Sequence, residues 1–272
     1  MREINLPIRT DGVEAALRLF LWENSLEYHQ GRLRPVMIVC TGGAYKMLSD
    51  QENQPIVARF LAMGYHVASL HYALAPQHHW PVQLHELAES VAILRANSAQ
   101  WCIDPEKIVV SGYSAGGHLA ASLGVLWNAP WLSSDLGRTP EEIRPNAMLL
   151  AYPVLTAVNP YHRGSFRNLL GDGWEERLDE VSLEKHVTPD TPPAFLWHTG
   201  EDTAVPIEGT LAFALALREN GVPFDLHIYQ KGRHSLSLAT PLTDIGKPGY
   251  QNVCVAQWPE QARLWLMQLF AE

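Results

Sequence analysis

The segment 111–117, with the sequence SGYSAGG, carries the pattern with the most specific chemistry in this chain of 272 residues. In the pattern Gly112-x-Ser114-x-Gly116, the serine lies between an apolar run at 108–110 and a run of small residues at 115–126. A turn from a strand into a helix is therefore expected at Ser114, with the two glycines leaving room for its neighbours. The pattern predicts that Ser114 is a nucleophile. A glycine-rich turn with a helix-capping serine is the alternative.

A serine hydroxyl is a weak nucleophile, so it needs a base and an acid that orients the base. In folds that use this kind of turn, the acid and then the histidine follow the serine along the chain. Asp202 and His234 occur in that order, each just after an apolar run that reads as a strand. They are the predicted acid and base. The competing residues are Glu201 for the acid, and His198 and His227 for the base.

A short glycine loop at 41–45, with the sequence TGGAY, directly follows the apolar run 36–40. Its small residues allow the backbone to approach a substrate closely, and backbone N–H groups can stabilise a developing oxyanion. We expect the N–H groups of Gly43, Ala44 and Ala115 to form an oxyanion hole. A plain tight turn is the alternative, whereas a phosphate-binding loop is disfavoured because neither of its glycine motifs is present.

Aromatic residues near these motifs are candidates for contact with a substrate. Tyr45, Tyr113 and Trp80 are predicted to bind it, and the other tryptophans that could stack on a sugar or aryl group are Trp127, Trp131 and Trp174. Large aromatic side chains more often simply bury area. The pairs at 78–79 and 85–86 lack the spacing that places two imidazoles on one helical face, so we expect no metal and no cofactor.

These side chains must be positioned by an alternation of strands and helices. Continuous apolar runs predict strands at 36–40, 66–70, 108–110, 148–152, 194–197 and 224–229. Helical spacing of apolar residues predicts helices at 50–63 with Asp50 as N-cap, 83–95, 115–126, 207–220 and 260–270. This order predicts an α/β fold with a mostly parallel central sheet flanked by helices.

No linker interrupts this alternation, so residues 1–272 are predicted to form a single domain. Two stretches, about 127–146 and 153–193, depart from the regular rhythm and are interpreted as insertions that form pocket walls or a lid. The final segment, 251–270, could pack internally or against a second copy of the chain, so a homo-oligomer stays open.

Composition excludes several other classes of protein. The chain is 47% hydrophobic with a net charge of -9, and no cluster of lysine and arginine suggests contact with nucleic acid. Its three cysteines are widely spaced, which favours reduced thiols. No apolar stretch reaches the roughly 18 residues of a membrane span, and the first residues do not read as a signal peptide. A cytoplasmic protein without membrane partners is expected.

Taken together, the motifs resemble an α/β-hydrolase of the hormone-sensitive-lipase-like and acetyl-esterase group, close to small bacterial carboxylesterases and acetylxylan-esterase-like enzymes. The resemblance spans roughly residues 34–236. It rests on the glycine loop 41–45, the run HYALAPQHHWP at 71–81, DPEKI at 104–108 before the Gly-x-Ser-x-Gly-Gly-His turn, Asp202-x-x-Val205-Pro206, and Gly232-x-His234. Thr41, Ala73 and Gln77 depart from the histidine, arginine and glutamate of the family pattern, which blurs the substrate more than the chemistry.

The resemblance implies a serine esterase that hydrolyses short-chain, acetyl-type esters, with acetylated sugars among the candidate substrates. Two other classes stay open at this stage. A peptidase of the prolyl-oligopeptidase type shares the fold and the order of the three residues, although such chains generally carry an extra domain. A ligand-binding member of the fold without catalytic activity is the other alternative.

Overall fold

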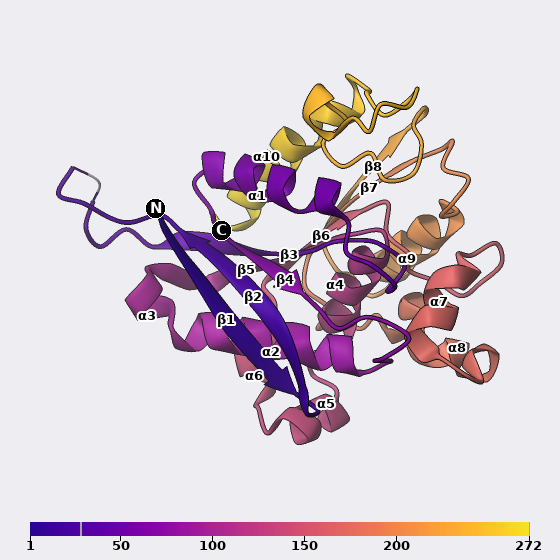
Figure 1. The fold of residues 1–272 in the computed structure, drawn as a ribbon, viewed down its shortest axis with the longest axis horizontal. Helices are drawn as coiled ribbons and strands as arrows, with labels where there is room; N and C mark the ends of the chain where they lie inside the picture. The colour runs from indigo at the N-terminus through magenta and orange to yellow at the C-terminus, as the bar shows by residue number, and fades with distance from the viewer. Residues whose placement is uncertain (28, 272) are drawn as a thin grey trace.

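Eight strands form one sheet in the order β1-β2-β4-β3-β5-β6-β7-β8 in the computed structural model, which describes residues 1–27 and 29–271 (Figure 1). The strands are β1 Arg2–Thr10, β2 Val13–Leu21, β3 Arg34–Cys40, β4 His66–His71, β5 Ile103–Tyr113, β6 Ala147–Ala151, β7 Ala194–Thr199 and β8 Phe224–Tyr229. All pairs from β4 to β8 are parallel. The mostly parallel α/β sheet expected from the sequence is confirmed.

The first two strands form an antiparallel hairpin that the expected elements do not include. Its turn is Asp11-Gly12, and both residues have positive φ, of 53° and 72°. This is the dipeptide that two-residue hairpin turns favour. Strand β2 pairs antiparallel with β4, so the hairpin extends the sheet by two strands. Polar and apolar residues alternate along β2, and its buried side chains face the core.

The helices cover both faces of the sheet, and strand β3 shows why. Val36, Ile38 and Cys40 belong to one apolar cluster, whereas Met37 and Val39 belong to the other. Successive side chains of a strand point to opposite faces, so a continuous apolar run is buried on both sides. The first cluster is covered by α2 Val82–Ala96, α4 Ala115–Leu126 and α9 Glu208–Glu219, and the second by α1 Gln54–Ala62 and α10 Trp258–Leu269.

The helices occur where the apolar spacing predicts them, with one difference at the start of α1. Asp50 begins a short 3-10 helix, η1 Asp50–Glu52, and the N-cap of α1 is Asn53. The proline at position 55 stands in the first turn of α1, where its missing N–H is not needed. Helix α4 is buried along its whole length, as its small apolar residues predict.

The remaining elements are short. They are α3 Ser98–Trp101, α5 Pro130–Leu136, α6 Pro140–Ile143, α7 Arg163–Leu170, η2 Trp174–Arg177, α8 Leu178–Val181, η3 Leu183–His186, η4 Pro241–Thr243 and η5 Val255–Gln257. No helix within residues 1–27 and 29–271 is both long and apolar enough to cross a bilayer.

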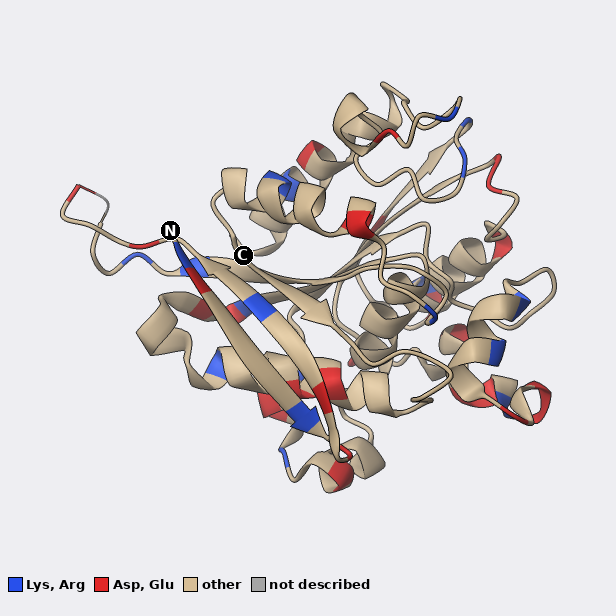
Figure 2. Cartoon of the chain, viewed as in Figure 1, with Lys and Arg blue, Asp and Glu red and all other residues tan. Residues whose placement is uncertain are grey.

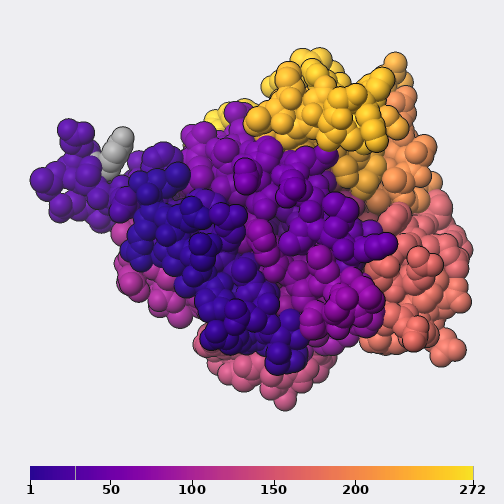
Figure 3. All heavy atoms as spheres, in the orientation of Figure 1, coloured from indigo at the N-terminus to yellow at the C-terminus, as the bar shows by residue number. Residues whose placement is uncertain are grey.

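Two irregular stretches and one loop complete the surface. Segment 127–146 joins the end of α4 to the start of β6, and its helices α5 and α6 pack along α2. Segment 153–193 carries α7, η2, α8 and η3, which lie together at one end of the molecule (Figure 1). At the opposite end, the loop between β2 and β3 projects from the body (Figure 3).

Candidate active site

Ser114 stands on a strained turn between β5 and α4. Its backbone has φ 54° and ψ −119°, which few non-glycine residues adopt. The two glycines of the motif are required by space. A Cβ on Gly112 would lie 2.1 Å from the carbonyl oxygen of Gly116, and one on Gly116 would lie 2.1 Å from that of Cys40. The turn therefore depends on both glycines, and it leaves Ser114 with 6% of its surface exposed.

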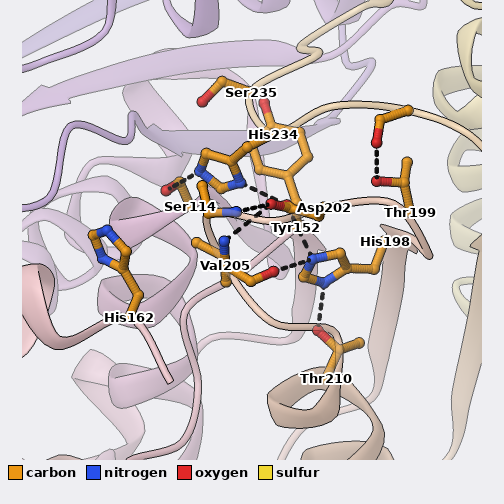
Figure 4. Close-up of polar contacts among 12 residues, drawn as sticks. Ser114, Tyr152, His162, His198, Thr199, Asp202, Val205, Thr210, His234 and Ser235 are labelled. Carbon is orange, nitrogen blue, oxygen red and sulfur yellow. Dashed lines mark hydrogen bonds and ion pairs between the residues drawn. The ribbon is translucent and has the colours of Figure 1, made fainter. Parts of the chain in front are cut away.

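Ser114, His234 and Asp202 form one chain of hydrogen bonds (Figure 4). The Oγ atom of Ser114 lies 2.8 Å from Nε2 of His234, and Nδ1 of His234 lies 2.7 Å from Oδ2 of Asp202. Asp202 follows β7 and His234 follows β8, so adjacent parallel strands deliver both side chains to the edge at which β5 ends. The structure thus brings the three predicted residues together.

Two rival residues lie outside this chain of hydrogen bonds. Glu201 is exposed beside Asp202. His227 is on β8, where its ring packs against Phe195 with the centroids 4.8 Å apart.

The carboxylate of Asp202 is held by four donors. Its Oδ1 atom accepts the backbone N–H groups of Ala204 and Val205, each at 2.9 Å, and its Oδ2 atom faces His234 and His198. Burial acts to raise the pKa of Asp202, but the hydrogen bonds from the two histidines and from Val205 outweigh it, so that the pKa is well below its ordinary value. Asp202 is therefore a buried carboxylate that stays charged.

His198, a rival for the base in the sequence, instead contacts the acid. Its side chain is fully buried, with Nε2 3.2 Å from Oδ2 of Asp202 and 3.1 Å from the carbonyl oxygen of Val205. Both of these atoms are acceptors, so Nε2 carries a proton. Its Nδ1 atom lies 2.8 Å from the hydroxyl of Thr210 on α9. The spacing His198-x-x-x-Asp202 after a buried strand is the sequence signal for this contact.

The glycine loop 41–45 lies directly against Ser114. A Cβ on Gly42 would come within 2.8 Å of Cβ of Ser114. Among the described residues, no hydrogen bond occupies the N–H groups of Gly43 and Ala44. Ala115 is the first residue of α4, so its N–H has no acceptor within the helix. These three N–H groups are the ones that the sequence predicts for the oxyanion hole.

Comparison with known proteins adds the family to this geometry. A family model described as BD-FAE matches residues 25–217, a range that includes the glycine loop, Ser114 and Asp202. The chain belongs to the BD-FAE family. Because the match covers well over half of the chain, the resemblance to esterases of the α/β-hydrolase superfamily is confirmed.

Relatives of this BD-FAE chain include esterases and one xylanase. Endo-1,4-beta-xylanase B of Butyrivibrio fibrisolvens is 36% identical over 217 residues, which are 76% of this chain and 33% of the relative. The carboxylesterase Cest-2923 of Lactobacillus plantarum WCFS1 superposes with a TM-score of 0.88 at 27% identity, and 98% of each chain is covered.

An acetyl ester-xyloside bifunctional hydrolase of Caldicellulosiruptor lactoaceticus superposes with a TM-score of 0.82 at 29% identity, covering 98% of this chain and 97% of that one. The chain spans between a third and a half of the length of the first curated relatives that it matches.

The buried carboxyl group of Glu52 accepts a hydrogen bond from the glycine loop of this BD-FAE member. Its Oε2 atom accepts the N–H of Gly42 at 2.7 Å, and its Oε1 atom accepts the hydroxyl hydrogen of Tyr152 at 2.8 Å. The oxygen of Tyr152 in turn accepts the N–H of Ser237, three residues after His234. Burial raises the pKa of Glu52, and these hydrogen bonds only partly oppose it. Sequence reasoning missed Glu52, because an acid in a 3-10 turn looks like an ordinary surface residue.

The residues predicted to contact substrate fall into different places. Tyr45 and Tyr113 are buried, and the hydroxyl of Tyr45 lies 2.7 Å from Nδ1 of His118. This packing gives no support to substrate contact by the two tyrosines. Trp80 lines a cavity of about 380 Å³ together with Trp131 and His186.

The sequence does not predict His162 as a site residue, yet it lies near Ser114. Figure 4 shows its ring on the Ser114 side of the hydrogen-bonded chain, with no bond to it. Its Nδ1 atom faces the backbone N–H and the hydroxyl of Ser165, at 3.2 and 2.8 Å. Burial lowers the pKa of His162, and the proximity of His234 lowers it further. His162 comes from the irregular stretch 153–193, where no motif points to it.

Proposed function

We propose that the chain is a serine carboxylesterase that hydrolyses short-chain acyl esters, with acetylated sugars among its substrates. The observation that carries the proposal is the continuous path from the Ser114 hydroxyl through His234 to the buried, charged carboxylate of Asp202. The names of the relatives, which include a carboxylesterase and an acetyl-ester hydrolase, support ester hydrolysis as the reaction class. The xylanase and xyloside names support a carbohydrate context.

In the proposed mechanism, the Ser114 oxygen attacks the ester carbonyl while its proton passes to Nε2 of His234. The Nδ1–H of His234 is held by Asp202, whose charge stabilises the imidazolium that forms. The carbonyl oxygen becomes an oxyanion, which accepts hydrogen bonds from the N–H groups of Gly43, Ala44 and Ala115. Collapse of this intermediate breaks the bond to the alcohol, and the proton on His234 goes to the departing oxygen. Water then attacks the acyl carbonyl while His234 takes its proton, and this proton passes to the Ser114 oxygen as the bond to the acid breaks.

The decisive experiment replaces the nucleophile. Ser114→Ala should lower kcat for 4-nitrophenyl acetate by more than about 1,000-fold, since no other group can form the acyl-enzyme. Labelling by a fluorophosphonate should disappear with it, while circular dichroism stays unchanged.

The matched control is Ser122→Ala, on the same helix. Its hydroxyl donates to the carbonyl oxygen of His118 at 2.8 Å and does not contact Ser114, His234 or Asp202. This variant should keep both activity and labelling. If Ser114→Ala keeps more than a tenth of the activity, the proposed nucleophile is wrong. Peptide amides assayed beside the ester separate an esterase from a peptidase.

A further inference from the structure

A cavity of about 940 Å³ lies beside the glycine loop. Two of its lining residues bind consecutive carbonyl groups of that loop. The side-chain amide of Asn168 donates to the oxygen of Ala44 at 2.8 Å, and the N–H of Ala75 donates to the oxygen of Tyr45 at 2.9 Å. Lys46, the next residue along the chain, itself lines the cavity. The cavity thus adjoins the carbonyl side of the glycine loop, and Ser114, Asp202 and His234 are not among its lining residues.

The cavity is lined by two cations that lack a carboxylate partner. Lys46 and Arg167 are both exposed, and neither forms an ion pair within the described part of the chain. Two other arginines of the same region are paired, Arg163 with Glu175 at 2.6 Å and Arg177 with Glu180 at 2.7 Å. Lys46 and Arg167 are thus not neutralised as their neighbours are.

Two cations without a carboxylate partner are unusual in a chain that is acidic as a whole. The chain as a whole carries a net charge of -9. One acid, Asp172, also lines the cavity, but it pairs with neither cation in residues 1–27 and 29–271. Figure 2 shows basic residues on the loop after β3 and on α7 at the same end of the molecule. The lining therefore combines two positive charges with one negative charge.

The other lining groups fit an organic ligand. Trp174 offers an aromatic wall, one side of which is covered by the guanidinium of Arg163, 5.1 Å from the ring centroid. The ring of His79 is fixed by a hydrogen bond of 2.9 Å between Nδ1 and the carbonyl oxygen of Asn168. An arginine and a lysine beside an aromatic wall match a ring that carries a carboxylate.

We propose that this cavity selects esters that carry a carboxylate away from the scissile bond. The inference rests on the proposed esterase function and names the substrate class of the same site. The carboxylate can stand on the alcohol side, as in an acidic sugar, or on the acyl side, as in the half-ester of a dicarboxylic acid. Lys46 and Arg167 bind it in either case, because both flank the same space.

Two pairs of substrates test the proposal and distinguish the two sides. The acyl pair is 4-nitrophenyl butyrate and 4-nitrophenyl hemisuccinate, and the alcohol pair is acetylated xylo-oligosaccharide without and with glucuronic acid side groups. In at least one pair, kcat/KM should be about fivefold or more higher for the anionic member. This preference should shrink in 0.5 M salt, because salt screens exposed charges.

Variants then assign the preference to the two cations. Lys46→Gln and Arg167→Gln should each lower the ratio of kcat/KM between anionic and neutral esters by about twofold, and the double variant should bring the ratio close to 1. The matched control is Arg32→Gln, which removes an exposed charge from the loop at the opposite end of the molecule. It should leave the ratio unchanged.

The failure of this inference can be told from the failure of the proposed function. If the wild-type protein hydrolyses both members of each pair equally, the cavity does not select a carboxylate. A preference that survives in the double variant would show that these cations do not cause it, which also overturns the inference. If the wild-type protein hydrolyses no ester and takes no fluorophosphonate, the esterase function fails and the inference fails with it.

Discussion

The imidazoles of His234 and His198 both contact Asp202, but they differ in their other hydrogen-bond partners. Oδ2 receives a hydrogen bond from His234 at 2.7 Å and another from His198 at 3.2 Å. His234 continues to Ser114, whereas His198 continues to Thr210 and ends within the core. His198 therefore fixes the position of Asp202, and of the two histidines only His234 contacts Ser114. A charged acceptor makes each of these bonds stronger than a neutral one.

Loss of the bond from His198 should be visible in the kinetics. His198→Phe keeps a ring in the buried space but removes the N–H, and we expect kcat to fall about tenfold, as for one hydrogen bond to a charged group. KM should change by less than about twofold.

A purely structural role would give a different result. Thr210→Val is the matched control, since it removes the partner on Nδ1 and leaves the bond from Nε2 to Asp202 in place. This variant should keep kcat within about twofold of the wild-type value. If His198→Phe lowers only the melting temperature and kcat does not fall, His198 does not act through Asp202.

At the scale of the elements, the position of Ser114 depends on how closely α4 approaches β3. Gly116 packs against the end of β3, and a Cβ there would lie 2.1 Å from the carbonyl oxygen of Cys40. Backbone cannot move aside as a flexible side chain can. The close packing of β3 against the start of α4 therefore requires a residue without a Cβ at position 116.

Gly116→Ala should test this close approach. We expect a loss of about 1–3 kcal/mol in the free energy of unfolding, measured by urea denaturation, and a fall in kcat as Ser114 shifts. Gly31→Ala is the control, because its Cβ would meet only the side chain of His29, at 3.6 Å. A Gly116→Ala protein as stable and as active as the wild type would contradict the tight packing.

The sequence predicts the elements best where local pattern and burial agree. The run 36–40, the small residues at 115–126 and the strand at 224–229 all match their elements closely, since each is set by its own apolar spacing. The hairpin of β1 and β2 carries the turn signal Asp11-Gly12. Its strands alternate between exposed and buried residues, and this pattern predicts a strand less clearly than a continuous apolar run does.

Residues of the site are predictable when a motif carries them. Ser114, Asp202 and His234 each sit in a recognisable spacing, and the structure brings them into contact. Glu52, Tyr152 and His162 have no such spacing. They reach the site through contacts between segments far apart in the chain, and a single sequence does not report those contacts.

At the scale of the whole molecule, Glu86 should make stability depend on pH. This acid is buried on α2, where its Oε2 atom accepts the N–H of Ala73 at 2.8 Å and its Oε1 atom has no partner in the described chain. Burial raises the pKa of Glu86 from 4.5 to about 7, against the hydrogen bond from Ala73 and with a smaller contribution from Asp11. The folded state thus binds this proton more tightly than the unfolded state does.

The sign of the effect follows from this difference. The tighter binding of this proton stabilises the folded protein fully below about pH 4.5. This stabilisation is lost as the pH rises through about 7, because the folded protein must then hold the buried charge of Glu86. Glu86→Gln stays neutral, so from pH 4.5 to pH 8 it should gain up to about 3 kcal/mol relative to the wild type. Urea unfolding at both pH values measures this gain. The exposed Glu219→Gln should show none, and an equal difference at the two pH values would contradict the prediction.

The glycine loop is anchored at Gly42 by Glu52, at Ala44 by Asn168 and at Tyr45 by both Ala75 and His118. These four hydrogen bonds within a few residues restrict movement of the loop as a unit. In the proposed mechanism, a loop fixed in this way neither widens for a bulky acyl group nor closes around a small one. If the proposed esterase function holds, we expect discrimination by acyl length to come from steric exclusion at this fixed loop.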